Sequence, residues 1–279
     1  MNCTDVAAAE AEVVVCWNQP HGIWDQLPAV RMAHSIGVGV DHVLADPTFP
    51  DVPVCKVIDD AQVQRMAEYV LWCTLYYHRG FDLTARRQRE KVWQRPPNRR
   101  ADQVVVGVMG LGQIGAQIAA ALQRQGYDVR GWSRSGKPIE GVRVYGGEAG
   151  QDDFLRELDL LVCMLPLTRD TTGILDSKLF ARLKPGTRLI QCGRGPQLNE
   201  PDLVAALNCG QLGGAVVDVF HDEPLPQDNP LWEHPGVLVT PHMAAVMPLA
   251  DVVEQIAENC ERLLSGEPLL RVVERAAAY

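Results

Sequence analysis

The sequence has few of the features that mark membrane, secreted or nucleic-acid-binding proteins. No apolar run reaches the roughly 18 residues that a membrane-spanning helix needs. Asp5, Glu10 and Glu12 interrupt the first alanines, where a signal peptide would have a basic and then an apolar segment. The formal net charge is −9, so we expect neither nucleic acid nor an anionic membrane as a partner. These absences favour a cytoplasmic protein.

Cysteine is present, but not in the spacings that signal a disulfide scaffold or a metal site. The eight cysteines are scattered and form no CxxC pair. In a chain of this length such a distribution is typical of buried or free thiols in a reducing cytosol. No pair of cysteines or histidines has the spacing of zinc ligands, so we expect no metal.

What is present is an alternation of apolar strands and helices. The 279 residues and the hydrophobic content of 47% suffice for one large or two ordinary domains. Strands are expected within 12–17, 30–43 and 52–57, and a more regular strand–helix rhythm begins at residue 103. Continuously apolar strands that alternate with helices predict an α/β fold with a doubly wound parallel sheet.

A glycine-rich turn follows the strand at the start of this rhythm. Gly110, Gly112 and Gly115 have GxGxxG spacing, between a strand and a helix that begins near Gln113 and Ile114. Gly110 would form the tight turn, Gly112 would let the pyrophosphate approach, and Gly115 would let helix and strand pack closely. The helix N-terminus would favour the phosphates. The alternative is a glycine-rich turn in another α/β fold.

The next strand ends without the carboxylate that an NAD site usually has there. Ser133, Arg134 and Ser135 follow it instead. An arginine between two serines can bind a 2′-phosphate through charge-assisted hydrogen bonds, so we expect NADP(H) to be preferred. The alternative is that Arg134 is a solvated loop residue, in which case NAD(H) is also accepted.

Three ionisable residues follow later strands: Arg194, Glu223 and His242. Ligands of an open parallel sheet bind beyond the carboxyl ends of its strands, so these residues form a candidate catalytic site. Each also has a plain structural interpretation: a turn cap, a surface charge and a buried histidine, respectively.

With these residues the sequence resembles the D-isomer-specific 2-hydroxyacid dehydrogenase family over nearly its whole length. The similar segments are "GLGQIG", "CGRGPQLNEPDLVAAL", "GGAVVDVFHDEPLP" and "TPHMAA". The "WSRS" turn, the stretch "EPLPQDNPLWEHPGVLVTPHMAA" and the final "AAAY" are most similar to the bacterial glyoxylate/hydroxypyruvate reductase A branch.

The resemblance implies roles for the three residues. Arg194 would bind the substrate carboxylate and polarise the keto oxygen, although Gly193 replaces the usual alanine before it. His242 would donate a proton to the developing alkoxide, and Glu223 would orient it. Asp218 would face the nicotinamide carboxamide.

The resemblance also implies further contacts. We expect Leu165, Pro166, Cys192 and Gly193 to line the cofactor site. Cys192 lies beside Arg194, but no histidine is placed to activate it, so strand packing is the better interpretation.

On the substrate side, the resemblance assigns the "SIGVGVDHV" turn to the substrate carboxylate. The N–H groups of Val38 and Gly39 would bind it, and Trp17 would line the pocket. Alternatives are a tight turn alone and core packing of Trp17.

We therefore expect two α/β domains, a flavodoxin-like substrate domain and a Rossmann-like cofactor domain. Residues 1–65 and 244–279 would form the substrate domain, and 66–243 the NAD(P)-binding domain. The helix expected at 61–81, apolar all round, and the polar loop at 87–100 would form a homodimer interface. Family members normally carry another strand and helix before the first strand. Either the start codon is wrongly placed or the substrate domain lacks its first strand, and in the second case we expect an exposed sheet edge and a lower melting temperature than for a version extended upstream.

The expected activity is NADPH-dependent reduction of small 2-keto acids: glyoxylate to glycolate and hydroxypyruvate to D-glycerate. One alternative is an NAD(P)-binding sensor resembling the corepressors of this superfamily, which would bind the cofactor with little turnover. The other is a phosphoglycerate-type dehydrogenase, which would prefer NAD and have a carboxylate in place of Arg134.

Overall fold

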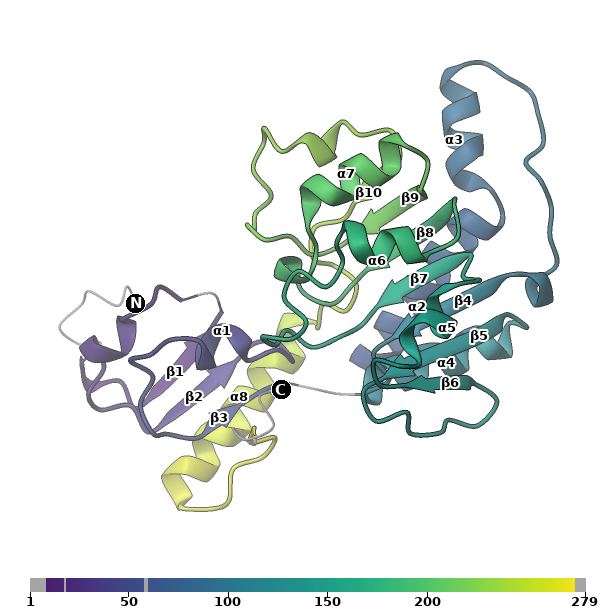
Figure 1. Ribbon diagram of the computed structural model, residues 1–279. Helices are drawn as coiled ribbons and strands as arrows, with labels where there is room; N and C mark the ends of the chain where they lie inside the picture. The colour runs from purple at the N-terminus through teal and green to yellow at the C-terminus, as the bar shows by residue number, and fades with distance from the viewer. Residues whose placement is uncertain (1–8, 18, 58–59, 274–279) are drawn as a thin grey trace. The chain divides into compact units, whose positions relative to one another are not determined.

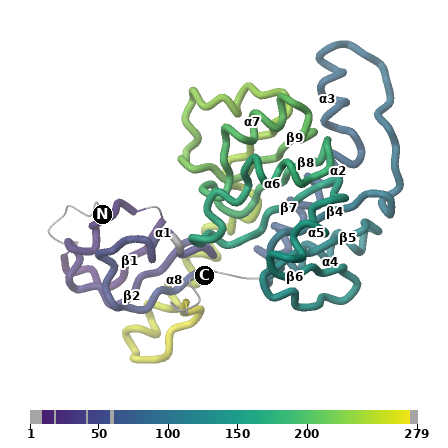
Figure 2. The backbone as a smooth tube through the Cα atoms, in the orientation of Figure 1, coloured from purple at the N-terminus to yellow at the C-terminus, as the bar shows by residue number. Residues whose placement is uncertain are grey.

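The structure, a computed structural model, divides into two compact units (Figure 1). It describes residues 9–17, 19–57 and 60–273. The smaller unit comprises residues 1–62 and 247–279, and the larger comprises residues 63–246. The tube in Figure 2 shows that the smaller unit combines both ends of the chain. The segment before the first strand, on which the expected missing strand depends, lies largely outside the described residues.

The smaller unit is built on a parallel three-stranded sheet. Its strands β1 (Val13–Cys16), β2 (Met32–Ser35) and β3 (Val54–Cys55) are paired in the order β1-β2-β3. The short helix α1 (Asp41–Leu44) and the long helix α8 (Leu249–Ser265) belong to the same unit. Buried side chains around the sheet, such as Trp24 and Val43, form its core.

The larger unit contains a parallel seven-stranded sheet in the order β10-β9-β8-β7-β4-β5-β6. The bounds are β4 (Val105–Met109), β5 (Asp128–Ser133), β6 (Arg143–Gly146), β7 (Leu160–Cys163), β8 (Thr187–Gln191), β9 (Leu212–Val217) and β10 (Val237–Val239). The chain winds outward from β4 to β6 and then returns to β7, on the other side of β4. This reversal is the point at which doubly wound sheets bind ligands, and it confirms the predicted fold class.

Helices cover both faces of this sheet (Figure 1). One face packs against α2 (Asp60–His78) and α4 (Gln113–Arg124), and the other against α5 (Gln151–Leu155), α6 (Ser177–Arg182) and α7 (Glu200–Asn208). Within β7, Leu161 and Cys163 belong to one core cluster, whereas Leu160 and Val162 belong to the other. Burial on both faces explains why the strands are apolar without alternation.

The long helix expected at 61–81 differs from the structure at its C-terminal end. It ends at His78, and a second helix, α3 (Phe81–Arg89), begins after Gly80. Gly80 has φ 67°, a left-handed conformation that ends a helix readily only at glycine. The predicted loop at 87–100 was therefore wrong at its start, where the last turn of α3 lies. Among the described helices, none is both long and apolar enough to cross a membrane.

Candidate active site

The glycine-rich turn between β4 and α4 has the geometry of a phosphate cradle. Gly110 has φ 108°, and a Cβ atom there would meet the backbone of Met164 at 2.7 Å. A Cβ atom on Gly115 would collide with the carbonyl oxygen of Gly110, so helix and turn can touch only at glycine. Gly112 is open, since a Cβ atom there would meet nothing within 4 Å. Next to it, α4 begins at Gln113. The backbone N–H groups of Gln113 and Ile114 lie in its first turn, where N–H groups have no partner within the helix and favour an anion.

The turn after β5 presents a cation and two hydroxyl groups at the same edge of the sheet. Arg134 is exposed, and the first acidic residue after it is Glu140. The Ser133 hydroxyl accepts a hydrogen bond from the Gly136 N–H at 3.2 Å, and Ser135 accepts one from the Lys137 N–H at 3.4 Å. These bonds fold the turn around Arg134 and leave both serine hydroxyl protons available to an anion.

The ends of β7 and β8 are tied together by a side chain that sequence analysis missed. The Gln197 amide donates to the carbonyl oxygens of Leu165 and Pro166 at 2.9 and 3.0 Å. Its oxygen accepts a hydrogen bond from the Arg194 N–H at 2.8 Å. Gln197 thus fixes the position of the Arg194 turn relative to the turn that follows β7. Only its position three residues after Arg194, typical of a capping side chain, could have indicated this.

Two neighbours of this turn are explained by packing. Cys192 is buried, and its burial raises the pKa of the thiol, so it is a poor nucleophile. At Gly193, a Cβ atom would collide with the amide oxygen of Gln197. The usual alanine would therefore have to displace the Gln197 amide.

The three ionisable residues expected to act in catalysis lie at the carboxyl edge of the sheet, after β8, β9 and β10. The Nδ1 atom of His242 lies 2.8 Å from Oε2 of Glu223. Oε1 of Glu223 accepts a hydrogen bond from the Phe220 N–H at 2.9 Å. Arg194 donates to the Gly193 carbonyl oxygen at 2.8 Å, and its charge acts on Glu223. The structure therefore brings all three residues into one electrostatic neighbourhood.

Glu223 is held in its charged form. Burial alone would raise its pKa, but the hydrogen bonds from His242 and the Phe220 N–H outweigh burial. The positive charges of His242 and Arg194 act in the same direction, and the pKa of Glu223 is lowered. A carboxylate on Nδ1 requires a proton on that nitrogen, so Nε2 is the atom that can exchange a proton with a ligand.

Asp218, expected to face the nicotinamide, is buried immediately after β9. Its carboxylate accepts hydrogen bonds from the Thr240 hydroxyl at 2.6 Å, the Met243 N–H at 2.9 Å and the Ala244 N–H at 3.0 Å. These contacts hold the His242 turn. The carboxamide contact stays a prediction.

The residues expected to bind substrate belong to the smaller unit. Trp17 is 42% exposed and packs edge-on against His42, with ring centroids 5.3 Å apart. The Ser35 hydroxyl closes the following turn, accepting from the Gly37 N–H at 3.1 Å and donating to the Gly39 carbonyl oxygen at 3.0 Å. Within the described part of the chain, the N–H groups of Val38 and Gly39 have no hydrogen-bond partner. They are therefore available to an anion.

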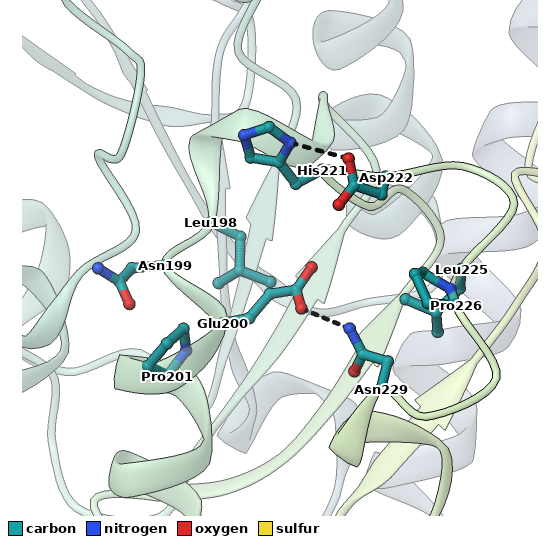
Figure 3. A pocket seen from close by; sticks show the side chains of 9 residues that line it. All are labelled: Leu198, Asn199, Glu200, Pro201, His221, Asp222, Leu225, Pro226 and Asn229. Carbon is teal, nitrogen blue, oxygen red and sulfur yellow. Dashed lines mark hydrogen bonds and ion pairs between the residues drawn. The ribbon is translucent and has the colours of Figure 1, made fainter.

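A pocket in the larger unit lies beside Glu223, but none of Arg194, Glu223 and His242 lines it (Figure 3). It is lined by the start of α7 and by the loop on both sides of Glu223, including His221, Asp222 and Asn229. Asn229 donates to Glu200 at 2.8 Å, and His221 lies 3.5 Å from Asp222. Because its polar groups are paired with one another, we assign the chemistry to the Arg194, Glu223 and His242 edge.

Comparison with known proteins agrees with this geometry. Residues 71–244 match the model of the D-isomer specific 2-hydroxyacid dehydrogenase NAD-binding domain. The chain belongs to this family. It is 38% identical over 275 residues to glyoxylate/hydroxypyruvate reductase A of Serratia proteamaculans, which covers 96% of this chain and 88% of that protein. The family resemblance inferred from the sequence is therefore confirmed.

Solved structures of D-isomer specific 2-hydroxyacid dehydrogenases also superpose well. A family protein from Klebsiella pneumoniae matches with a TM-score of 0.92 and 43% identity, covering 98% of this chain and 88% of that one. The NADPH-dependent glyoxylate/hydroxypyruvate reductase from Sinorhizobium meliloti, solved with NADP and sulfate, matches with a TM-score of 0.89 and 37% identity, over 99% and 90% of the two chains. Phosphoglycerate dehydrogenase from Lactobacillus plantarum matches with a TM-score of 0.64 and 28% identity.

Proposed function

We propose that the protein is a reductase of small 2-keto acids that prefers NADPH, with glyoxylate and hydroxypyruvate as substrates. The observation that carries this proposal is the 2.8 Å contact between His242 and Glu223, beside Arg194 at the carboxyl edge of the sheet. A protonated imidazole and a guanidinium next to the cofactor turn are the groups that keto-acid reduction needs. The names of the relatives support the same substrates.

The residues present fit NADP(H). The open face of Gly112 and the first turn of α4 would hold the pyrophosphate, and Ser133, Arg134 and Ser135 would hold the 2′-phosphate. We place Leu165, Pro166, Cys192, Gly193 and Asp218 along the rest of the cofactor. When bound, NADPH supplies a hydride from its nicotinamide ring. NAD(H) has no 2′-phosphate and would lack the contact with Arg134, so we expect it to bind more weakly than NADP(H).

The chain's own residues would then bind the keto acid and supply the proton. Arg194 binds the carboxylate and polarises the keto oxygen. His242 donates the proton on Nε2 to that oxygen as negative charge develops on it. Glu223 stays ionised, holds Nδ1–H and stabilises the imidazolium before transfer. In the oxidative direction His242 takes the proton back.

We propose that the smaller unit supplies the substrate contacts. Val38 and Gly39 would donate their free N–H groups to the substrate carboxylate, and Trp17 would form an apolar wall that favours small substrates. In this assignment the smaller unit is the substrate domain, expected at residues 1–65 and 244–279, and the larger unit is the cofactor domain, expected at 66–243.

Two other functions are less well supported. A phosphoglycerate-type dehydrogenase would have a carboxylate where Arg134 stands, and the phosphoglycerate dehydrogenase structure is less similar than the reductase structure. An NAD(P)-binding sensor would keep the same three residues but turn over very slowly, so steady-state turnover distinguishes it from the reductase.

We further propose a homodimer that works in the cytoplasm. Trp72 and Leu75 on α2, and Phe81 and Trp93 beyond it, are exposed apolar side chains on adjoining segments. Burial of such a surface against a second copy would remove it from water. The seven cysteines that the structure describes are all free, which supports a reducing compartment.

Replacement of His242 tests the proposed chemistry. His242→Ala should lower kcat for glyoxylate reduction about a hundredfold or more, because it removes the general acid. The Kd for NADPH, measured by quenching of tryptophan fluorescence, should stay within about twofold because His242 is not placed at the phosphates. A kcat close to that of the unsubstituted protein would contradict the assignment.

A further inference from the structure

The turn that carries His242 is held in an unusual conformation. His242 has φ 51°, in the left-handed region that residues other than glycine rarely adopt. Such a conformation persists only when surrounding contacts over-determine it. The His242 N–H donates to the carbonyl oxygens of Asp218 at 2.9 Å and of Thr240 at 3.1 Å. The orientation of the imidazole therefore depends on what fixes Asp218 and Thr240.

The Asp218 carboxylate fixes the turn on both sides of His242. Before it, the Thr240 hydroxyl donates to Oδ1 at 2.6 Å. After it, the Met243 N–H donates to Oδ1 at 2.9 Å and the Ala244 N–H to Oδ2 at 3.0 Å. Together with the carbonyl contact, one buried residue holds the turn at four points. Burial raises the pKa of Asp218, against the opposing effect of these three hydrogen bonds. An ionised carboxylate accepts all three, whereas a protonated one would have to give up an acceptor site.

A residue far away in the sequence completes this network. The Tyr69 hydroxyl, on α2, lies 2.6 Å from the Thr240 hydroxyl. A threonine hydroxyl has one proton, and here that proton is donated to Asp218. Tyr69 must therefore be the donor to Thr240, which gives a directed chain from phenol to hydroxyl to carboxylate. Burial raises the pKa of Tyr69, so the phenol keeps its proton. Hydrogen bonds in such a chain polarise and strengthen one another.

We propose that Tyr69 is a positioning residue for His242, acting through Thr240 and Asp218 to hold the His242 turn in its left-handed conformation. The inference rests on the proposed reductase function, in which His242 donates the proton. Tyr69 itself touches neither His242 nor Glu223 among the contacts described. Its effect on proton transfer is therefore indirect. Tyr69 also hydrogen-bonds Cys73, one turn along α2, but the contact that leads toward His242 is the one with the Thr240 hydroxyl.

Substitutions that remove single hydroxyl groups test this proposal. Tyr69→Phe should lower kcat for glyoxylate about fivefold and Thr240→Val about tenfold, since each loses one or more hydrogen bonds at nearly constant shape. The KM values for glyoxylate and NADPH should change less than about twofold, because Arg194 and the glycine turn are untouched. Thr240→Ser keeps the hydroxyl and should retain normal kcat.

The double variant Tyr69→Phe/Thr240→Val separates the network from independent packing effects. Because Tyr69 acts only through Thr240, the double variant should be no slower than Thr240→Val alone. Losses that multiply would overturn the proposal, as would a normal kcat in Tyr69→Phe. Tyr127→Phe is the matched control. The Tyr127 hydroxyl also hydrogen-bonds a residue of α2, His78, at 2.9 Å. Tyr127 directly precedes β5, so it lies at the amino ends of the strands, away from His242, and its replacement should leave kcat unchanged.

Hydrogen exchange supplies a readout that does not depend on activity. In Tyr69→Phe and Thr240→Val, the peptide with the Met243 and Ala244 N–H groups should exchange about tenfold faster, whereas a β4 peptide should not change. If the unsubstituted protein fails to reduce either keto acid, the proposed function fails, and exchange alone then decides the positioning role. Unchanged exchange in both variants would overturn it.

Discussion

At the scale of single residues, the glycine before Arg194 leaves room for the side chain that holds the Arg194 backbone. The usual alanine before the arginine is Gly193 here, and a methyl group at this position would collide with the Gln197 amide oxygen. Gln197 in turn holds the Arg194 N–H at 2.8 Å. The Gln197 amide therefore occupies the space that an alanine methyl group would need, and it holds the backbone of Arg194.

This pairing predicts a strongly non-additive double-mutant cycle. Gly193→Ala should lower kcat/KM for glyoxylate about tenfold, because the methyl group displaces Gln197 and with it Arg194. In the Gln197→Ala background the same substitution should cost about twofold or less, since only a contact with the Leu165 carbonyl oxygen at 3.1 Å remains. Steady-state kinetics of the four proteins measures this, and equal losses in both backgrounds would disprove the pairing.

Candidate site residues could be predicted from the sequence where a local pattern, such as a position directly after an apolar strand, marks them. Arg194, Glu223 and His242 each follow an apolar strand, and the structure brings them together. Gln197 and Tyr69 were missed because their partners are distant: Gln197 reaches Leu165, and Tyr69 bonds Thr240, 171 positions away. A lone polar residue in a helix gives no sign of such a partner until the chain is folded.

At the scale of elements, we propose that the turn after β5 sets the choice of cofactor. Arg134→Asp replaces a cation by an anion facing the expected 2′-phosphate, so kcat/KM with NADPH should fall about a hundredfold. With NADH it should change less than about threefold, because NADH has no 2′-phosphate for the new carboxylate to repel.

Arg124→Asp is the matched control for this substitution. Arg124 is exposed in the last turn of α4, at the far end of that helix, and its replacement makes the same change in charge. It should leave both cofactors unaffected. Equal losses with NADPH and NADH in Arg134→Asp would remove the phosphate role of Arg134.

Most helices and strands of the larger unit were predictable from the sequence, but one edge strand and one break between two helices were not. The buried strands were recognised by their continuous apolar runs. Strand β6 (Arg143–Gly146) was missed, because as an edge strand it is partly exposed and has no apolar run. The break between α2 and α3 was missed because Gly80 ends a helix only through its left-handed conformation, while the flanking residues still favour a helix.

The exposed apolar side chains of α2 predict a dimer that depends on them. Trp72→Glu/Leu75→Glu should place charges in the interface and shift the protein from dimer to monomer in sedimentation velocity experiments at micromolar concentration. Leu264→Glu on α8, also an exposed apolar position, should leave the dimer intact. A monomer before substitution, or a dimer after it, would contradict the interface.

At the scale of the whole molecule, the stability of the smaller unit depends on one buried histidine. His34 donates from Nδ1 to the Ser35 carbonyl oxygen at 3.0 Å and accepts from the Asn259 amide at 3.1 Å, which joins β2 to α8. Burial, and to a smaller extent the charge of Arg271, lower the pKa of His34 against the opposing Ser35 bond. A protonated His34 could not accept from Asn259, so the folded unit requires the neutral ring.

Stability should therefore fall in mildly acidic solution. Below the ordinary histidine pKa of 6.5, His34 is protonated in the unfolded chain but stays neutral in the folded chain, because folding lowers its pKa. The free energy of unfolding therefore decreases as the pH falls below 6.5. We expect the melting temperature to drop by about 5 °C between roughly pH 7 and pH 5. His34→Gln should reduce this slope, and His21→Gln, at an exposed position of the same unit, should keep it. An unchanged slope in His34→Gln would exclude His34 as its source.

The length of the chain left one or two domains open, and two domains were expected only from the family resemblance. The same resemblance, and no local pattern, joined the last helix to the first strands. That connection depends on contacts such as His34 with Asn259, between residues 225 positions apart.

The account is tested most directly by the rate at which the purified protein oxidises NADPH and NADH, in parallel assays with glyoxylate and with hydroxypyruvate. We predict rapid oxidation of NADPH with either keto acid, at a kcat/KM at least about tenfold higher than with NADH. Tight binding of NADPH with no turnover of either keto acid would contradict the reductase assignment, and faster oxidation of NADH than of NADPH would contradict the role of Arg134.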